Sequence, residues 1–394
     1  MIPTSTPAFD KRSALAFIVA LGVVSLFADM AYEGMRAISG PFLGLLGASG
    51  AIVGTVAGSG ELVGYLLRLF SGNLAQRSGA YWPITVAGYA IQMAAVPALA
   101  LAGSWQVAAL LIVVERAGKA VRNPAGNTMM SHAGEEIGQG WAFGLHEALD
   151  QLGALAGPLI AALVLAHHGL YRNAFLWLGV PAAITIVLVL LVAFRFPAAA
   201  RIPKVPEHES RSGLSRTFWL YAAAAALIAF GFADYPLIAY HFSKTHVVSA
   251  ALVPVFYAGA MGASGLASLL FGRWFDARGL SVMIPGLLFG AFAAPLVFFG
   301  GFGFALIGTL LWGAALGVQG SVMSAAIARL VPAHGRARAY GIFTAIFGVA
   351  WFLGSAAMGA LYDVSMVWLV AVSVLPQLAA LVPLALALRT MKPA

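Results

Sequence analysis

The sequence is poor in charge and has no cysteine. Only 9% of its 394 residues are charged, whereas 61% are hydrophobic. Because a soluble domain carries roughly a quarter charged residues, this composition excludes an ordinary water-soluble fold and indicates that the lipid bilayer is the solvent. The absence of cysteine excludes a disulfide framework and a thiolate metal site.

The few charges are mostly basic and give a formal net charge of +8. Nucleic-acid-binding proteins share this property, but most Lys and Arg residues here lie at the ends of apolar segments, where membrane topology explains them. We therefore expect no nucleic-acid partner. Residues 1–12 are polar, and the apolar run after them has no small-residue cleavage site, so a first transmembrane helix is predicted rather than a signal peptide.

Long apolar runs make up most of the chain, and each is long enough, at about 20 residues, to cross the hydrocarbon core. Twelve such segments cover residues 14–36, 48–70, 82–102, 105–125, 140–166, 173–195, 217–240, 250–271, 281–300, 303–326, 339–362 and 365–389. The predicted fold is an all-α membrane protein with twelve transmembrane helices in two six-helix bundles. The predicted domains are residues 1–195, a cytoplasmic linker at 196–216, and residues 217–394.

The distribution of Lys and Arg predicts the orientation. If the N-terminus is cytoplasmic, most basic residues fall on the inner side, and little beyond Arg36, Arg172 and Lys244 falls outside. This bias follows the positive-inside rule and puts both termini in the cytoplasm. We expect a multi-pass protein of the inner or plasma membrane that works as a monomer.

The two halves repeat each other. The matching pairs are "LFADM" (26–30) with "GFADY" (231–235), "SGNLAQRSG" (71–79) with "FGRWFDARG" (271–279), and "AFG" (142–144) with "AYG" (339–341). The pairs occur in the same order and at nearly the same offset. A parallel repeat of six helices is an architecture of alternating-access transporters.

These motifs resemble those of the major facilitator superfamily, whose loop between helices 2 and 3 follows the pattern G-x-L-x-D-R-x-G. The first copy keeps Gly72, Leu74, Arg77 and Gly79 but has Gln76 at the Asp position. The second copy keeps Gly272, Asp276 and Gly279 but lacks the Arg that should follow the Asp. The resemblance implies that this loop gates the cytoplasmic side and that each half carries part of the charged latch.

A second motif, "GALAGP" at 153–158, is similar to the G-x-x-x-G-P pattern of the antiporter branch of that family. Gly153 and Gly157 let a neighbouring helix approach closely, and Pro158 bends the helix where the two halves must rock. Ordinary small-residue packing, common in membrane bundles, is the alternative interpretation.

Charged residues are concentrated in a few of the predicted helices. A charge near the bilayer centre costs roughly 2.5–3.5 kcal/mol on insertion scales, so such residues face the bundle interior or a wet cavity. They are Asp29, Glu33, Arg36, Glu61, Arg68, Glu115, Arg116, Lys119, His146, Glu147, Asp150 and Asp234. The third, sixth, ninth and twelfth segments carry no charge in their interiors, and these are the lipid-facing helices of the family that the sequence resembles.

Asp29 and Glu33 are candidates for proton coupling. They are four residues apart and share a helix face, and Arg36 is three residues further on and can pair with Glu33. Two carboxylates in a low dielectric cannot both ionise cheaply, so one is expected to carry a proton near neutral pH. Glu147 and Asp150 are further candidates. A static salt-bridge network is the alternative interpretation.

The remaining polar and aromatic residues of the expected interior are candidates for substrate binding. They are Arg36, Glu61, Glu115, Arg116 and Asp234, with Tyr235, Trp312 and Gln319 from the second half. Aromatic side chains beside a wet cavity suit amphipathic or cationic organic compounds, although packing in the core or at the interface also explains them.

Three alternatives are open. "HEALD" (146–150) is one substitution from the H-E-x-x-H zinc signature, which an intramembrane hydrolase could use. An acid-rich cavity could carry divalent metal ions, although Arg116 and Lys119 oppose a free cation. Those basic residues could instead hold anionic amphiphiles in a transporter or flippase.

The sequence thus favours a proton-coupled efflux antiporter for small amphipathic or cationic organic compounds. Its expected partners are that substrate, protons and the lipid bilayer. No enzymatic activity, cofactor or resident metal is expected.

Overall fold

The computed structural model describes residues 10–200, 202, 214–331 and 336–390, and these residues form helices without any strand. The first group of helices is α1 (Lys11–Leu45), α2 (Gly50–Ser78), α3 (Tyr81–Ala98), α4 (Trp105–Gly134), α5 (Gln139–His168) and α6 (Tyr171–Arg195), with short 3₁₀ turns at Leu99–Leu101 and Pro197–Ala200. The second group is α7 (Arg216–Gly231), α8 (Tyr235–Thr245), α9 (Val253–Arg278), α10 (Met283–Phe299), α11 (Phe302–Leu330), α12 (Arg336–Tyr362), α13 (Met366–Ala379) and α14 (Leu381–Thr390), with a 3₁₀ turn at Gly279–Val282.

Each of the twelve predicted segments coincides with a helix or a pair of helices. Two are interrupted: the segment 217–240 divides into α7 and α8, and the segment 365–389 divides into α13 and α14. Ten helical runs among the described residues are long and apolar enough to cross a membrane. The charged helix α4 is not one of them, and α9 and α10 form a single run, Val253–Phe299. The chain is therefore a multi-pass membrane protein.

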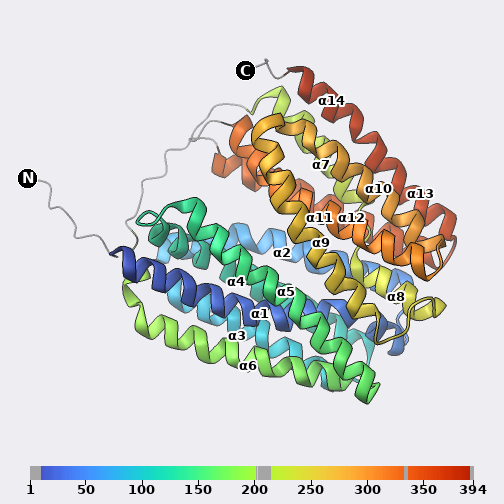
Figure 1. Cartoon of the computed structure of the whole chain (residues 1–394), viewed down its shortest axis with the longest axis horizontal. Coiled ribbons are helices and arrows are strands. Elements are labelled where there is room, and N and C mark those ends of the chain that lie inside the picture. Colours follow the sequence, from blue (N-terminus) through green and yellow to red (C-terminus); the bar gives the residue numbers. More distant parts are fainter. Residues whose placement is uncertain (1–9, 201, 203–213, 332–335, 391–394) are drawn as a thin grey trace, which may run out of the picture.

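The helices form two bundles (Figure 1), and corresponding pairs of helices pack against each other in both. In the first bundle α1 packs on α5, α2 on α4, and α3 on α6; in the second, α7 packs on α12, α9 on α11, and α10 on α13. Gly157 and Gly354 occupy matching places, because a Cβ on Gly157 would collide with the carbonyl oxygen of Met30 and one on Gly354 with that of Phe230. The predicted pair of pseudo-symmetric bundles is confirmed. The domain limits stay a prediction, and most of the expected linker, 203–213, lies outside the described residues.

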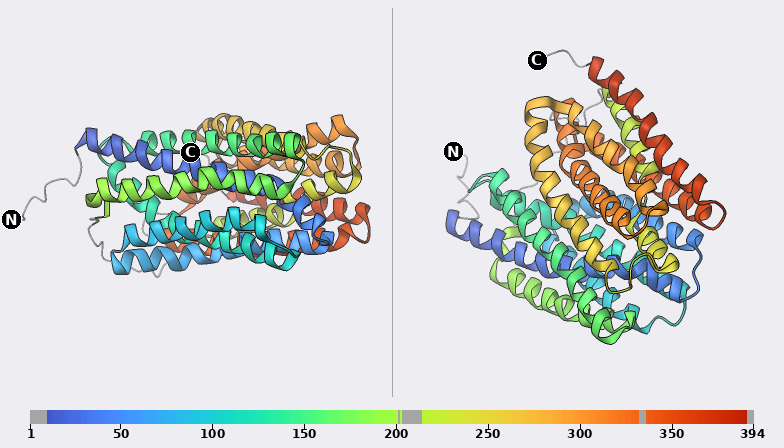
Figure 2. Two further views of the ribbon diagram at one scale, coloured as in Figure 1. Left: turned by 90° about the horizontal axis from the view of Figure 1, so that it is seen from below. Right: turned by 45° about the vertical axis from the view of Figure 1, so that its right-hand side comes forward.

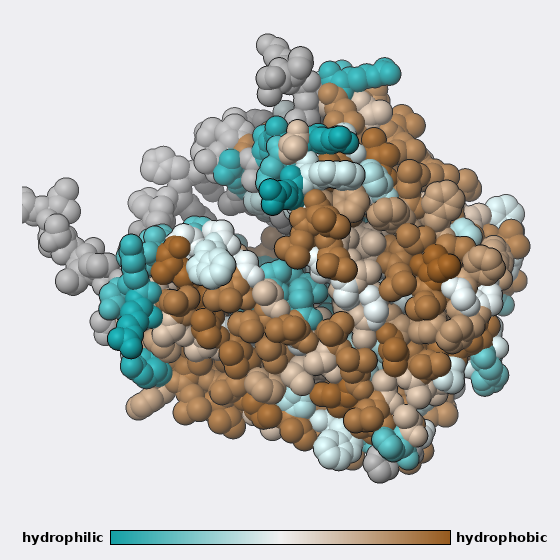
Figure 3. Space-filling model, in the orientation of Figure 1, coloured by the Kyte–Doolittle hydropathy of each residue, from teal (hydrophilic) through white to brown (hydrophobic). Residues whose placement is uncertain are grey.

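The helices run roughly along one common direction (Figure 2). Basic residues lie in the last turns of α2, α6, α9, α11 and α14, which end near the start of α1. The side surface seen in Figure 3 is largely apolar, as lipid contact requires.

The break between α7 and α8 leaves backbone carbonyl groups without helical partners inside the bundle. Ser373 Oγ and Gln377 Nε2 donate to the carbonyl oxygen of Gly231 at 2.6 and 3.0 Å, and Trp312 Nε1 donates to that of Ala233 at 2.7 Å. Non-helical backbone at membrane depth is tolerated only where such partners satisfy it. The break therefore belongs to the fold and fixes the position of Asp234 within it.

Candidate functional site

A cavity of about 880 Å³ lies between the two bundles and shows as a hollow in Figure 3. Its walls come from α1 to α5 on one side and from α9, α11 and α12 on the other. On α2 and α4 the lining residues lie in the later turns, whereas on α5 and α12 they lie in the earlier turns. Because these helices alternate in direction, the cavity opens at the end of the molecule where α1 begins.

The opposite end is sealed by contacts between the bundles. A Cβ on Gly40 of α1 would collide with the carbonyl oxygen of Pro236 in α8, and one on Gly54 of α2 would collide with that of Ser355 in α12. The carboxylate of Asp363, just after α12, accepts hydrogen bonds from the backbone N–H groups of Gly50 and Ala51 at 3.1 and 2.9 Å. The cavity is thus open on one side only.

Asp29 faces the cavity from α1 and is held by two cations of α4. Lys119 Nζ lies 3.5 Å and Arg122 Nη2 lies 3.8 Å from its Oδ1. Arg122 also donates to Gln92 Oε1 at 2.7 Å and to the Tyr89 hydroxyl at 2.9 Å. These contacts make Asp29 the centre of a network that joins α1, α3 and α4.

Glu33, one turn along α1, contacts the other bundle. The hydroxyl of Tyr257 on α9 donates to Glu33 Oε2 at 2.5 Å. Tyr257 is fully buried, and its ring centroid lies 4.3 Å from that of Tyr235 and 6.1 Å from that of Trp312. A carboxylate of the first bundle is thereby connected to an aromatic cluster of the second.

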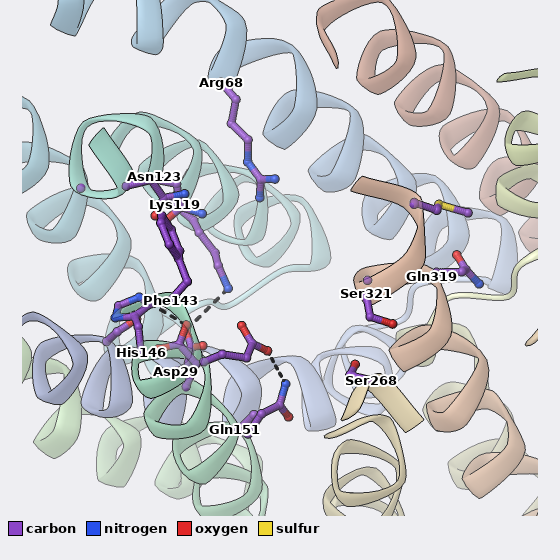
Figure 4. Close-up of a pocket in the computed structure, with 18 of the residues that line it drawn as sticks. Asp29, Arg68, Lys119, Asn123, Phe143, His146, Gln151, Ser268, Gln319 and Ser321 are labelled. Atoms are coloured by element: carbon purple, nitrogen blue, oxygen red, sulfur yellow. Dashed lines mark hydrogen bonds and ion pairs between the residues drawn. The ribbon is translucent and has the colours of Figure 1, made fainter. Parts of the chain in front are cut away.

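Helix α5 contributes two more carboxylates to the cavity wall. His146 Nε2 lies 3.6 Å from Asp150 Oδ2, and Gln151 Nε2 donates to Glu147 Oε1 at 2.8 Å (Figure 4). The other oxygen of Asp150 is buried without a hydrogen-bond partner. The spacing of four residues places His146 and Asp150 on the same face of α5.

A second set of charges lies in the sealed part of the interface. Arg116 Nη2 lies 2.6 Å from Glu61 Oε1, and Arg36 Nη2 lies 3.4 Å from the same oxygen and 3.7 Å from Asp234 Oδ1. Trp351 Nε1 and Ser355 Oγ also donate to Asp234 at 3.0 and 2.5 Å. Arg36 therefore pairs across the bundles rather than with Glu33, as its spacing had suggested, because the break after α7 brings Asp234 beside it.

The structure separates the predicted site residues into two groups. The four candidates for proton coupling, Asp29, Glu33, Glu147 and Asp150, all line the cavity, together with Gln319. The other candidates for substrate binding do not line it: Arg36, Glu61, Glu115, Arg116, Asp234, Tyr235 and Trp312. Glu115 is fully buried and accepts from Gln92 Nε2 at 2.7 Å, while Tyr235 donates to the carbonyl oxygen of Val253 at 2.6 Å.

The glycines of the repeated loop motif have a common local role. Gly79 ends α2 with φ 69° and Gly279 ends α9 with φ 61°, both in the left-handed region that favours glycine. Gly72 and Gly272 lie on the helices before them, with Arg77 in the last turn of α2 and Asp276 in that of α9. Their role in gating stays a prediction.

Helix α5 packs closely on α1 at the other glycine motif. A Cβ on Gly153 or Gly157 would collide with the carbonyl oxygen of Leu26 or Met30, respectively, and Pro158 follows inside the helix. Close packing within one bundle is thus a structural reason for both glycines.

Several residues of the site were not singled out from the sequence. Tyr257 forms a hydrogen bond across the interface, and Trp351 lines the cavity. Asp363 contacts the other bundle at the closed end. Aromatic residues are common in membrane helices, so composition gave no signal for the first two. For the metal-dependent alternatives, no group of three or more His, Asp or Glu residues that could hold a metal ion occurs in the described part of the chain.

Comparisons with known proteins agree with the fold. The chain is 40% identical over 377 residues to uncharacterized proteins of Mycobacterium bovis and Mycobacterium tuberculosis, which covers 94% of this chain and 92% of each relative. Residues 14–264 match the model of the Major Facilitator Superfamily.

Solved structures of similar fold include a mutant of the peptide transporter POT with alafosfalin (TM-score 0.76, 14% identity, covering 97% of this chain and 98% of that one). A mutant of the nucleoside transporter NupG is also similar (0.75, 14%, 93% and 99%). A bacterial homolog of the human lysosomal transporter Spinster, inward-facing and occupied, is a third (0.64, 18%, 99% and 100%). Because the family model spans more than half of the sequence and the fold agrees, the chain belongs to the Major Facilitator Superfamily.

Proposed function

We propose that the protein is a proton-coupled antiporter that exports small amphipathic or cationic organic compounds across the cell membrane by alternating access. One observation carries the proposal: four carboxylates, Asp29, Glu33, Glu147 and Asp150, face a single cavity between the bundles. Carboxylates in a wet cavity at membrane depth are groups that can bind and release protons as their surroundings change.

The surroundings of Asp29 suggest how a proton could drive the cycle. Its charge holds Lys119 and Arg122 of α4 against α1. A proton on Asp29 removes that charge, so both cations lose their partner and the contact between α1 and α4 weakens. Protonation of Glu33 would likewise change its hydrogen bond with Tyr257, which crosses the bundles. Proton binding would thus alter contacts that the movement of the bundles must break or remake.

We infer efflux rather than uptake from the "GALAGP" motif. We infer that the cavity opens toward the cytoplasm from the distribution of Lys and Arg. The aromatic residues Phe343, Phe347 and Trp351 line the wall of the second bundle and suit the apolar part of a substrate.

The test is transport by the purified protein in proteoliposomes that contain a pH-sensitive dye. Cationic, neutral, zwitterionic and anionic amphipathic compounds are added under an imposed pH gradient. We expect proton movement that is coupled to movement of the compound in the opposite direction. Substrate transport that is indifferent to the pH gradient would overturn the coupling, and movement of anions alone would favour the transport of anionic amphiphiles.

A further inference from the structure

The charges that face the cavity divide into those that contact a side chain of another helix and those whose contacts stay within their own helix. Asp29, Lys119 and Arg122 form one ion-paired group, and Glu33 is bonded to Tyr257. Only charges outside these contacts are free to attract a substrate. Among the lining residues that the structure describes, they lie on two helices, α2 and α5.

Arg68 is the free cation on α2. No carboxylate of the described residues lies within 4.0 Å of it, and its guanidinium lies 5.5 Å from the ring centroid of Tyr65. Figure 4 shows its side chain extending from α2 toward the cavity, which Lys119 and Asn123 of α4 also line. An arginine without a carboxylate partner suits a carboxylate or phosphate group.

Helix α5 carries the opposite charge on another side of the cavity. Glu147 has only the neutral Gln151 as a hydrogen-bond partner, and no Lys or Arg of the described chain pairs with either Glu147 or Asp150. Oδ1 of Asp150 is buried without a hydrogen-bond partner, while its Oδ2 lies 3.6 Å from His146 Nε2. Two carboxylates one turn apart, with an unused acceptor, suit an ammonium group.

Among the described residues, the wall of the second bundle carries no charge. It presents the polar side chains of Ser268, Gln319 and Ser321 and the aromatic rings of Phe343 and Phe347. Gln319 is 8% exposed, and its Oε1 has no hydrogen-bond partner. This wall can pack against an apolar body and accept one hydrogen bond, but it does not select the sign of a charge.

We propose that the cavity selects zwitterionic compounds whose anionic and ammonium groups are separated by an apolar body. Arg68 binds the anionic group, Glu147 and Asp150 bind the ammonium group, and the neutral wall covers the body between them. A substrate with one charge leaves the other pole of the cavity without a partner, so it binds more weakly. The inference rests on the proposed function only in taking this cavity as the substrate site, and it does not depend on proton coupling.

The experiment measures equilibrium binding to the full-length protein in nanodiscs, without a pH gradient. The probes are 6-aminohexanoate and 8-aminooctanoate, compared with hexylamine and octylamine as cations and with hexanoate and octanoate as anions. Each set has the same apolar chain and differs only in its charged ends. We expect at least one amino acid to bind about tenfold more tightly than both matched single-charge compounds.

Variants assign the two poles. Arg68→Gln should reduce the affinity of the amino acid to that of the amine, and Glu147→Gln combined with Asp150→Asn should reduce it to that of the carboxylate. Arg278→Gln, at the end of α9 and outside the cavity lining, is the matched control and should bind as the parent does. Melting temperatures of all variants separate loss of binding from loss of folding.

Equal affinity for amine and amino acid, tighter binding of the carboxylate, or binding of none of the probes would overturn the inference. Selective binding of an amino acid without proton-driven flux in proteoliposomes would support the inference and refute the proposed coupling. Proton-driven flux of cations, with no preference for zwitterions, would support the proposed coupling and refute the inference.

Discussion

Asp363 binds the first turn of a helix that belongs to the other bundle. Its two carboxylate oxygens accept from the backbone N–H groups of Gly50 and Ala51, which begin α2. Ser49 accepts from a third N–H group of the same turn, that of Ile52, at 3.4 Å. A helix start leaves four such groups without helical partners and favours negative charge. This contact exists only while the sealed end of the molecule is closed.

Asp363→Ala should therefore favour opening of the sealed end. Loss of a cap costs about 1 kcal/mol, which changes the ratio of closed to open molecules by roughly fivefold. Because the chain has no cysteine, spin labels can be placed at Leu45→Cys and Ala250→Cys, both exposed near that end and on different bundles. Pulsed dipolar spectroscopy should show a larger fraction of long distances.

The control is Asp10→Ala, because Asp10 caps α1 within its own bundle by accepting from Ser13 N at 2.8 Å. It removes a helix cap without touching the interface, so the distance distribution should not change. The same distribution in the Asp363→Ala variant and the parent would show that the carboxylate does not hold the bundles together.

Gly40→Ala should favour opening of the sealed end more strongly than Asp363→Ala does. The added methyl group would collide with the backbone carbonyl oxygen of Pro236, which no side-chain movement can relieve. Overpacking costs about 1–3 kcal/mol, and here it applies only to the closed state. Open molecules should therefore accumulate and transport should slow. Gly64→Ala is the control, because nothing lies within 4 Å of its added methyl group; equal behaviour of the two variants would contradict the prediction.

The ion pair between Arg36 and Asp234 should be important for stability. Asp234 is 2% exposed and also accepts from Trp351 and Ser355. Removing one partner of a buried pair costs about 3–5 kcal/mol, whereas replacing both by apolar residues is often nearly neutral. Asp234→Leu should thus lower the melting temperature strongly, and adding Arg36→Met should recover part of the loss. Additive losses in this double-mutant cycle would show that the two residues act independently.

The sequence predicted where helices and buried charges lie but not how the charges pair. Apolar runs and the positive-inside bias arise because each segment faces either lipid or water. Both can therefore be recognised from a short stretch of sequence. The partner of Arg36 depends on the helix break at Phe232–Asp234 and on how the bundles are packed, which neighbouring residues do not determine. Gly231 and Pro236 around that break were the available signal, but the apolar run continues through it. The contact of Asp363 with α2 also depends on how the bundles are packed. The short polar connection that contains Asp363 therefore gave no indication of it.

Asp29→Asn is the sharpest test of proton coupling. The amide keeps the shape of the side chain but cannot gain or lose a charge, so accumulation driven by a pH gradient should be abolished while the protein still folds. Lys119 and Arg122 lose an ionic partner, but Arg122 keeps Gln92 and Tyr89, so the melting temperature should fall only slightly. Exchange of labelled against unlabelled substrate, which needs no net proton movement, should continue.

Glu135→Gln is the matched control, since its side chain is exposed on the connection between α4 and α5, outside the cavity lining, and lies 3.8 Å from His132 in the adjacent turn. It also removes one acidic charge, yet both accumulation and exchange should match the parent protein. If Asp29→Asn still accumulated substrate under the pH gradient, the proton would have to bind at another carboxylate of the cavity, and Glu33→Gln and Asp150→Asn would be the variants that identify it.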